Sequence, residues 1–484
     1  MLVHKALFAL MVVLAAACSS PSALPPIATQ APPSGPPAGF TAGSYEGTTP
    51  GGAAYKIEAP TSWNGTLLLY SHGYRAEGTA NPAIDAGDAT TAKYLLDHGF
   101  ALAGTSYSSM GWALEQAFKD QIDALEVFAQ KVGKPSRTIA WGHSLGGIIT
   151  AGLVQLRPER FAGALPMCGV LAGGIGAWDA ALDGEFVATT LLAPAATSGP
   201  LRSPSIQLVK ISDPTANGAA AKAMYAEAQK TPAGRARLSL AAALSAEPGW
   251  FSIATAEPAA ADFVSQQVNQ ELWQEQVSAP FAFNFRAELE KRAGGNPSTN
   301  VGVDYARLLD ASPWKAEVTA LYQAAGLSVQ DDLGALARAP RISADASARD
   351  YLKRFITFDG NLKIPVLTLH TSSDGLVPVE GEYAYGQTVA RATRSTLLRQ
   401  LYVRRAGHCA FTPAETVTAL DALIKRLDTG AWPDLAPAGL TSSAQQLGAD
   451  YNVFSVGGKV VPVGAAFFKF DPAPFPRMFD AYVH

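Results

Sequence analysis

A serine flanked by glycines is the strongest chemical signal in this chain of 484 residues. The segment GHSLGG, residues 142–147, follows the apolar run RTIAW and precedes the apolar run IITAGLVQL. A strand that turns sharply into a helix presents a serine at its corner, and small residues two positions before and after it permit the bend. The spacing predicts Ser144 as a nucleophile; the alternative is a glycine-rich turn that only packs the helix.

A serine hydroxyl is a weak nucleophile at neutral pH, so it needs a base and a group that orients the base. Asp374 lies in SSDGLVP after the strand-like segment KIPVLTLH, and His408 lies in AGHC after TLLRQLYVRR. Both residues follow sheet segments, in the chain order serine, acid, histidine. We predict Asp374 as the acid and His408 as the base. Asp359 is the alternative acid, and His370, which ends a strand, is expected to be a core or supporting residue.

Attack on a carbonyl creates an oxyanion, which backbone N–H donors must meet. The N–H of Leu145, directly after the serine, is the first predicted donor. The second is the N–H of Tyr74 in SHGYR, a loop after the strand-like run GTLLLY, where Gly73 would let the chain bend. A simple turn at the strand end is the alternative for this loop.

The surrounding pattern predicts how these loops are positioned. Over residues 45–170 short apolar runs alternate with helical stretches, which favours a mostly parallel sheet covered on both faces. The pattern resumes over 350–430, whereas 171–349 is rich in Ala, punctuated by Gly and Pro, and reads as helical. We therefore predict a doubly wound α/β core split by a helical cap. An extension over 431–484 contains the hairpin pattern VFSVGGKVVPVG, but no role for it can be predicted.

The N-terminal sequence has the features of an export signal. Residues 1–18, MLVHKALFALMVVLAAAC, join a lysine to an apolar run too short to span a bilayer. The ending LAAAC resembles the lipobox of bacterial lipoproteins, which implies lipidation of Cys18; an ordinary secretory signal is the alternative. Residues 19–44 are rich in Pro, Ser and Ala and predict a tether. We expect an exported protein, periplasmic, at the cell surface or secreted, that meets a membrane only through such an anchor.

Composition and cysteine content narrow the function classes. A net charge of −4 supplies no basic field for nucleic acid. No metal cluster, phosphate loop or dinucleotide fingerprint is evident, so we expect no cofactor and no metal. If Cys18 is lipidated or removed, only Cys168 and Cys409 remain of the 3 cysteines. In an oxidising compartment they could form one disulfide; two buried thiols are the alternative.

Four motifs together carry a family resemblance: WNGTLLLYSHGY, WGHSLGG, VLTLHTSSDGLVP and RRAGHCAF. Their order resembles the α/β-hydrolase superfamily, in particular its secreted bacterial esterase-like members with an inserted cap. The resemblance covers the two core segments and neither the insertion nor the C-terminal extension. It implies the same catalytic and oxyanion-binding residues as the spacing does, namely Ser144, Asp374, His408, Tyr74 and Leu145.

The cysteine after the proposed base carries a second likeness. It is similar to tannase and feruloyl-esterase relatives, in which this cysteine is bridged. There the partner precedes the serine, but this chain has His143 at that place. The resemblance therefore implies that a bridge from Cys409 would use Cys168.

Three functions remain open from the sequence. The first is hydrolysis of small or polymeric carboxylic esters through an acyl-enzyme. The second is an exported aminopeptidase-type serine peptidase similar to proline iminopeptidases, which grip a free amino terminus with acidic residues. For the cap acids Asp183, Glu185 and Glu288 we expect solvated helix faces. The third is a noncatalytic surface binding lipoprotein, disfavoured because all three triad positions hold competent residues.

The cap also contains aromatic residues that are candidates for lining an apolar acyl or aryl pocket. Packing in the core of the cap is the alternative for each. These residues are Trp250, Phe251, Trp273, Phe281, Phe283 and Phe285.

Overall fold

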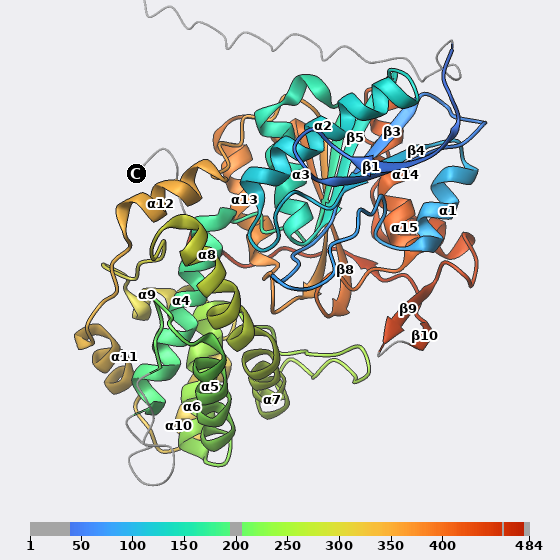
Figure 1. Cartoon of the computed structure of the whole chain (residues 1–484). Coiled ribbons are helices and arrows are strands. Elements are labelled where there is room, and N and C mark those ends of the chain that lie inside the picture. The colour runs from blue at the N-terminus through green and yellow to red at the C-terminus, as the bar shows by residue number, and fades with distance from the viewer. Residues whose placement is uncertain (1–38, 194–205, 457–458, 479–484) are drawn as a thin grey trace, which may run out of the picture.

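The computed structural model describes residues 39–193, 206–456 and 459–478 (Figure 1). The predicted signal, Cys18 and most of the predicted tether lie outside these ranges. Among the described helices, none combines the length and the apolar character that a membrane crossing requires.

A nine-stranded sheet forms the centre of the molecule, in the order β1-β2-β4-β3-β5-β6-β7-β8-β11. Neighbours from β4 through β8 pair in parallel, whereas β1, β2 and β11 join antiparallel at the two sides. Strand β3 is buried along its whole length, as expected for a strand with helices on both faces. The strands are β1 (Gly43–Thr48), β2 (Ala54–Ala59), β3 (Thr66–Ser71), β4 (Ala101–Thr105), β5 (Arg137–His143), β6 (Gly163–Met167), β7 (Val366–Ser373), β8 (Leu398–Ala406) and β11 (Phe467–Phe468).

Helices cover the two faces of this sheet (Figure 1). On one face, the apolar stripes of α2 and α3 pack against the sheet together with α13, and on the other α1, α14 and α15 do so. A capping box between Thr412 and Glu415 starts α14, and Gly430 ends it in a left-handed conformation. The helices are α1 (Ala89–Asp97), α2 (Leu114–Lys131), α3 (Leu145–Leu156), α13 (Glu380–Arg391), α14 (Pro413–Thr429) and α15 (Pro437–Gln446), with 3-10 turns η1 (Pro158–Arg160) and η5 (Ser395–Leu397).

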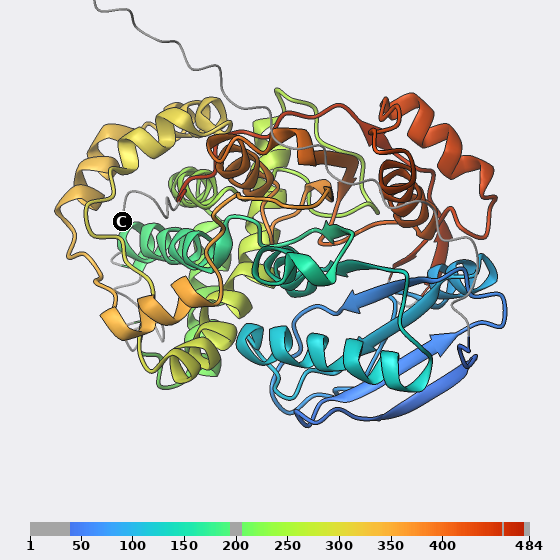
Figure 2. The ribbon, with the colours of Figure 1, turned by 90° about the horizontal axis from the view of Figure 1, so that it is seen from above.

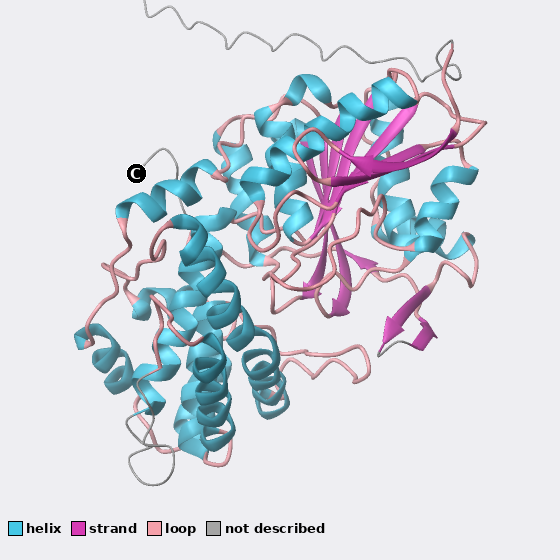
Figure 3. Cartoon of the chain, viewed as in Figure 1, coloured by secondary structure: helices cyan, strands magenta, loops and turns pink. Residues whose placement is uncertain are grey.

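The inserted segment is helical in its described part and lies beside the sheet as a separate layer (Figures 2 and 3). Its helices enclose an apolar core of their own. The first cap helix starts at Gly173 and the last ends at Arg354, against the predicted boundaries of 171 and 349. The cap helices are α4 (Gly173–Leu192), α5 (Pro214–Ala228), α6 (Pro232–Ser245), α7 (Phe263–Trp273), the π-helical turns η3 (Gln274–Ser278) and η4 (Phe281–Phe285), α8 (Arg286–Ala293), α9 (Tyr305–Ala311), α10 (Lys315–Ala324), α11 (Val329–Arg338) and α12 (Ala346–Arg354).

The C-terminal extension returns to both the core and the cap. The predicted hairpin is present, with β9 (Val453–Val456) antiparallel to β10 (Lys459–Pro462), and β11 then adds an edge strand to β8. Farther on, Phe475 packs with Ala180 of α4 and Ala384 of α13. The extension therefore connects a cap helix with a core helix, a role that the sequence had not indicated.

The expectation of solvated faces for the cap acids is wrong. The side chain of Asp183 is fully buried and accepts hydrogen bonds from Arg477, at 2.6 Å, and from Tyr305, at 2.8 Å. Glu185 is buried and accepts from the Tyr225 hydroxyl at 2.5 Å. Partners distant in the chain offset part of the cost of burying these carboxyl groups.

Glu288 is likewise enclosed rather than solvated. Its carboxylate accepts from the backbone N–H of Trp112 at 2.8 Å and from Arg292 at 2.7 Å. Because Trp112 precedes α2 and Glu288 belongs to α8, this contact connects the cap with the core.

Candidate active site

Ser144 lies at the sharp corner between β5 and α3. Its φ of 60° and ψ of −123° place a non-glycine residue in a conformation that only a tight turn imposes. A Cβ atom at Gly142 would lie 2.4 Å from the carbonyl oxygen of Ser71, and one at Gly146 would lie 1.9 Å from it. The glycines two residues before and after the serine are therefore required by the close approach of β3, as the motif predicts.

The structure brings together the three residues predicted as a triad. The Nε2 atom of His408 lies 2.7 Å from Ser144 Oγ, and its Nδ1 atom lies 2.7 Å from Asp374 Oδ2. These residues follow β5, β7 and β8, whose carboxyl ends meet at one edge of the sheet. Asp374, and not the alternative Asp359, contacts the histidine, because Asp359 precedes β7 and lies beside Gln155.

Asp374 is held in a fixed orientation. Its Oδ1 atom accepts backbone hydrogen bonds from Leu376, at 3.0 Å, and Val377, at 2.9 Å, which leaves Oδ2 for His408. Burial raises the pKa of this carboxyl, but the neighbouring His408 and His370 outweigh burial and lower it to about 2. Asp374 is therefore ionised at neutral pH and can stabilise a protonated His408.

His370 lies behind Asp374 and is fully buried. Its Nε2 atom lies 2.9 Å from the Val377 carbonyl oxygen and 3.6 Å from Asp374 Oδ2, and its Nδ1 atom lies 3.2 Å from Glu382 Oε1. Burial lowers the pKa of the ring, but Asp374 and Glu382 raise it to about 10. Both nitrogens face acceptors, so the ring carries two protons and balances two buried carboxylates.

The loop that holds His408 is tied to the end of β6 by a disulfide. Cys168 follows β6, Cys409 follows His408, and the two are bonded with their Cα atoms 5.3 Å apart. Both cysteines have positive φ angles, 41° and 53°, which non-glycine residues seldom adopt. The Sγ atom of Cys409 lies 3.3 Å from Nε2 of His408, so the bridge lies directly beside the base.

Leu145 directly follows Ser144, and the loop that contains Tyr74 passes close to the serine. Leu145 is the first residue of α3, so no carbonyl within that helix accepts its N–H. The loop after β3 passes close to the serine: a Cβ atom at Gly73 would lie 3.3 Å from Ser144 Cβ. The ring of Tyr74 stacks on Phe285 of the cap, with centroids 4.1 Å apart, which anchors this loop.

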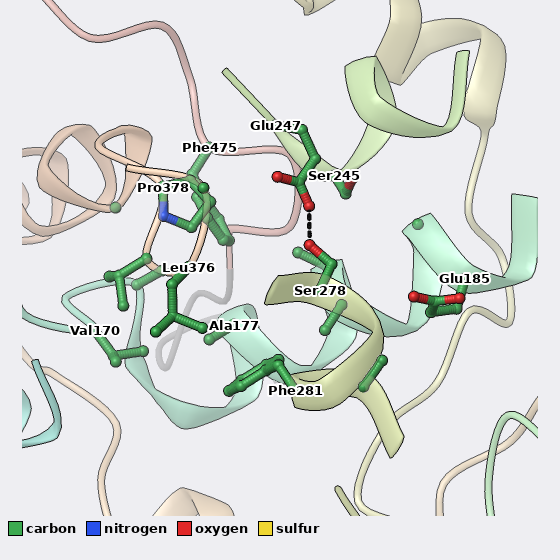
Figure 4. A pocket seen from close by; sticks show the side chains of 18 of the residues that line it. Val170, Ala177, Glu185, Ser245, Glu247, Ser278, Phe281, Leu376, Pro378 and Phe475 are labelled. Atoms are coloured by element: carbon green, nitrogen blue, oxygen red, sulfur yellow. Dashed lines mark hydrogen bonds between the residues drawn. The ribbon is translucent and has the colours of Figure 1, made fainter. Parts of the chain in front are cut away.

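A mostly apolar cavity lies between the cap and the loop that follows Asp374 (Figure 4). Gly375 and Leu376 form one wall, and Phe281 is the only one of the six cap aromatic candidates that lines it.

The other candidates have different positions. Trp273 packs against Gly375, where a Cβ atom would lie 2.3 Å from its ring, while Phe251 and Trp250 contact Trp273. Phe285 supports Tyr74, and Phe283 is buried in the core of the cap, as the alternative had it.

Among the residues that the structure describes, no group of three or more His, Cys, Asp or Glu side chains is arranged to hold a metal ion.

Comparison with known proteins agrees with a hydrolase. Residues 99–173 match the prolyl oligopeptidase family. An o-phthalyl amidase of Xanthobacter agilis is 29% identical over 429 residues, which cover 82% of this chain and 90% of the amidase.

Solved structures with detectable similarity include two hydrolases. Feruloyl esterase B from Aspergillus oryzae is 13% identical, with 81% of this chain and 82% of the esterase covered and a TM-score of 0.36. The Pyrococcus horikoshii acylaminoacyl peptidase is 10% identical with a TM-score of 0.33; the match covers 76% of this chain but only 38% of the peptidase.

The sheet order, the turn at Ser144 and the family match identify the chain as a serine hydrolase of the α/β-hydrolase type.

Proposed function

We propose that Ser144, His408 and Asp374 hydrolyse carboxylic esters through an acyl-enzyme, and that the protein does so as an exported lipoprotein anchored through Cys18. The observation that carries the catalytic proposal is the continuous hydrogen-bonded line from Ser144 Oγ through His408 to Asp374, with 2.7 Å at both steps. The sequence of residues 1–18 supports export and anchoring.

The reaction follows from this line of contacts. His408 Nε2 takes the Ser144 proton while Oγ attacks the carbonyl carbon, and Asp374 stabilises the imidazolium. The oxyanion faces the N–H groups of Leu145 and Tyr74. Collapse of this intermediate expels the alcohol with the proton from His408. Water then attacks the acyl-enzyme, His408 takes a proton from it, and the acid leaves as Ser144 regains its hydrogen.

Amide hydrolysis is the second candidate function. The similarity to the o-phthalyl amidase extends over 82% of this chain and supports it. An amide requires protonation of its leaving nitrogen, and in this proposal His408 supplies that proton through the same Nε2 atom. An aminopeptidase would also need residues that bind a free amino terminus. A noncatalytic binding protein would not need the hydrogen bond between Ser144 and His408.

Graded p-nitrophenyl esters compared with p-nitroanilides, including the 2-carboxybenzoyl anilide, test this proposal. We expect ester turnover in the wild type and none above background with Ser144→Ala. Rapid anilide cleavage with negligible ester cleavage would make the amide candidate correct. No labelling of the wild type by a fluorophosphonate probe would contradict a serine nucleophile, with Ser144→Ala as the unlabelled control. Incorporation of labelled palmitate in cells, absent in Cys18→Ala, tests the anchor.

A further inference from the structure

The cavity beside the Asp374 loop combines an apolar wall with polar side chains (Figure 4). Val170, Leu376, Phe281 and Phe475 supply apolar surface. Polar side chains that line the same space come from α4, from α6 and the residues directly after it, and from η3. They are Glu185, Ser245, Glu247, Gln274 and Ser278.

Two of these polar side chains have acceptor atoms without a donor in the described part of the chain. Glu247 is 4% exposed; its Oε1 atom accepts from the Ser278 hydroxyl, and its Oε2 atom has no partner. Gln274 is also 4% exposed; its Nε2 atom donates to the Leu238 carbonyl, and its Oε1 atom has no partner. Buried acceptors are normally paired, so two in one cavity indicate a site built for a donor.

The charges around the cavity indicate which donor fits. Its described lining includes two carboxyl groups, Glu185 and Glu247, and no Lys, Arg or His. Glu185 accepts from Tyr225 and is thereby partly satisfied. Burial raises the pKa of Glu247 to about 8, and no lining residue supplies the positive charge that would stabilise its carboxylate form. A ligand that brings both a cation and N–H donors would satisfy both orphan acceptors.

We propose that this cavity binds an apolar group that carries a protonated amine, with the ammonium donating to Glu247 Oε2 and Gln274 Oε1 and the apolar part lying against Phe281 and Leu376. Gly375 and Leu376 follow Asp374 in the chain, so one wall of the cavity lies next to the acid of the triad. The inference thus deepens the proposed function by naming a substrate class, amine-bearing acyl compounds, and that part rests on the proposed function. The binding of amines does not.

Calorimetric binding of 2-phenylethylamine and of its neutral counterpart 2-phenylethanol tests the site. The Ser144→Ala protein is used, so that the result is independent of hydrolysis. We expect the amine to bind at least about tenfold more tightly than the alcohol. Adding Glu247→Gln, which keeps the shape and removes the charge, should reduce this preference to less than about twofold.

Glu317→Gln is the matched control. Glu317 is another buried cap glutamate whose pKa burial raises to about 8, but it contacts Gln270 and does not line this cavity. The Glu317→Gln protein should keep the full preference for the amine. Equal affinities for amine and alcohol in the Ser144→Ala protein would overturn the proposal, and this comparison decides even if Glu247→Gln does not fold. An unchanged preference in a folded Glu247→Gln protein would overturn it as well.

Inhibition kinetics separate the site from its link to catalysis. In the wild type, 2-phenylethylamine should compete with p-nitrophenyl butyrate. Binding without competition would refute the substrate class but not the amine site. Absence of any ester or amide turnover, with amine binding intact, would refute the proposed function alone.

Discussion

The bridge between Cys168 and Cys409 should control both stability and turnover. It closes a loop with a sequence separation of 241 residues. In the chain-entropy model, a loop of this length stabilises the folded state by about 5 kcal/mol, and removal of a native bridge typically costs about 2–5 kcal/mol. We expect a Cys168→Ala/Cys409→Ala protein to lose free energy of unfolding within that range.

Turnover should fall for a separate reason. Both cysteines have φ angles in the left-handed region, which is unfavourable for residues other than glycine by about 1–2 kcal/mol. Without the bridge each can relax, and His408 is covalently next to Cys409. Because misplacement of a reacting group by about 1 Å can cost on the order of a hundredfold, we expect kcat to fall at least about tenfold with little change in KM.

Urea unfolding and steady-state hydrolysis of p-nitrophenyl butyrate, each with and without reductant, measure the two effects. The wild type should lose stability and kcat on reduction, whereas the double variant, which has no bridge to reduce, should not respond. Equal unfolding midpoints and equal kcat for wild type and variant would refute the reasoning. Two alkylatable thiols in unreduced, denatured wild type would show that the bridge is absent.

Three other substitutions test the surroundings of the triad. His370→Gln removes the cation between Asp374 and Glu382, and should lower the free energy of unfolding by about 3 kcal/mol. Folding raises the pKa of His370 from 6.5 to about 10, so the charged ring stabilises the folded state fully below pH 6.5, and this stabilisation disappears as the pH rises through 10. The loss of unfolding free energy in His370→Gln, measured by urea unfolding, should therefore shrink between pH 6 and pH 10. A loss that is the same at both pH values would contradict a charged ring. Gly73→Ala places a methyl group 3.3 Å from Ser144 Cβ and should reduce kcat/KM at least about tenfold with an unchanged melting temperature. An unchanged kcat/KM would show that this loop is not part of the active site. Arg477→Met should lower the free energy of unfolding by about 3 kcal/mol, because Asp183 and Asp179 lose a buried partner. Lys469→Met, at an exposed position of the same extension, should leave the free energy of unfolding unchanged. Equal stability of the two variants would contradict this explanation.

The residues around Ser144 could be predicted because local rules govern them. A tight turn between strand and helix tolerates only small flanking residues, so the glycines at 142 and 146 are visible in the sequence. Asp374 and His408 were identifiable because each directly follows an apolar strand, and parallel strands end at one edge of a sheet. Those rules also favoured Asp374 over Asp359, which precedes a strand and lies away from His408.

The environment of the cap's polar residues could not be predicted in this way, because their hydrogen-bond partners lie far away in the chain. Asp183 pairs with Arg477 across a sequence separation of 294 residues, and no local sequence pattern predicts such a contact. On a helix, an acid paired in this way has the same sequence signature as a solvated one, which explains the wrong expectation for Asp183, Glu185 and Glu288. Glu247 could be predicted even less, because the feature that distinguishes it is an oxygen atom without a hydrogen-bond partner in the folded structure. The proposed amine site therefore assigns substrate specificity to the buried acceptors that the folded cap leaves unpaired, and not to the triad.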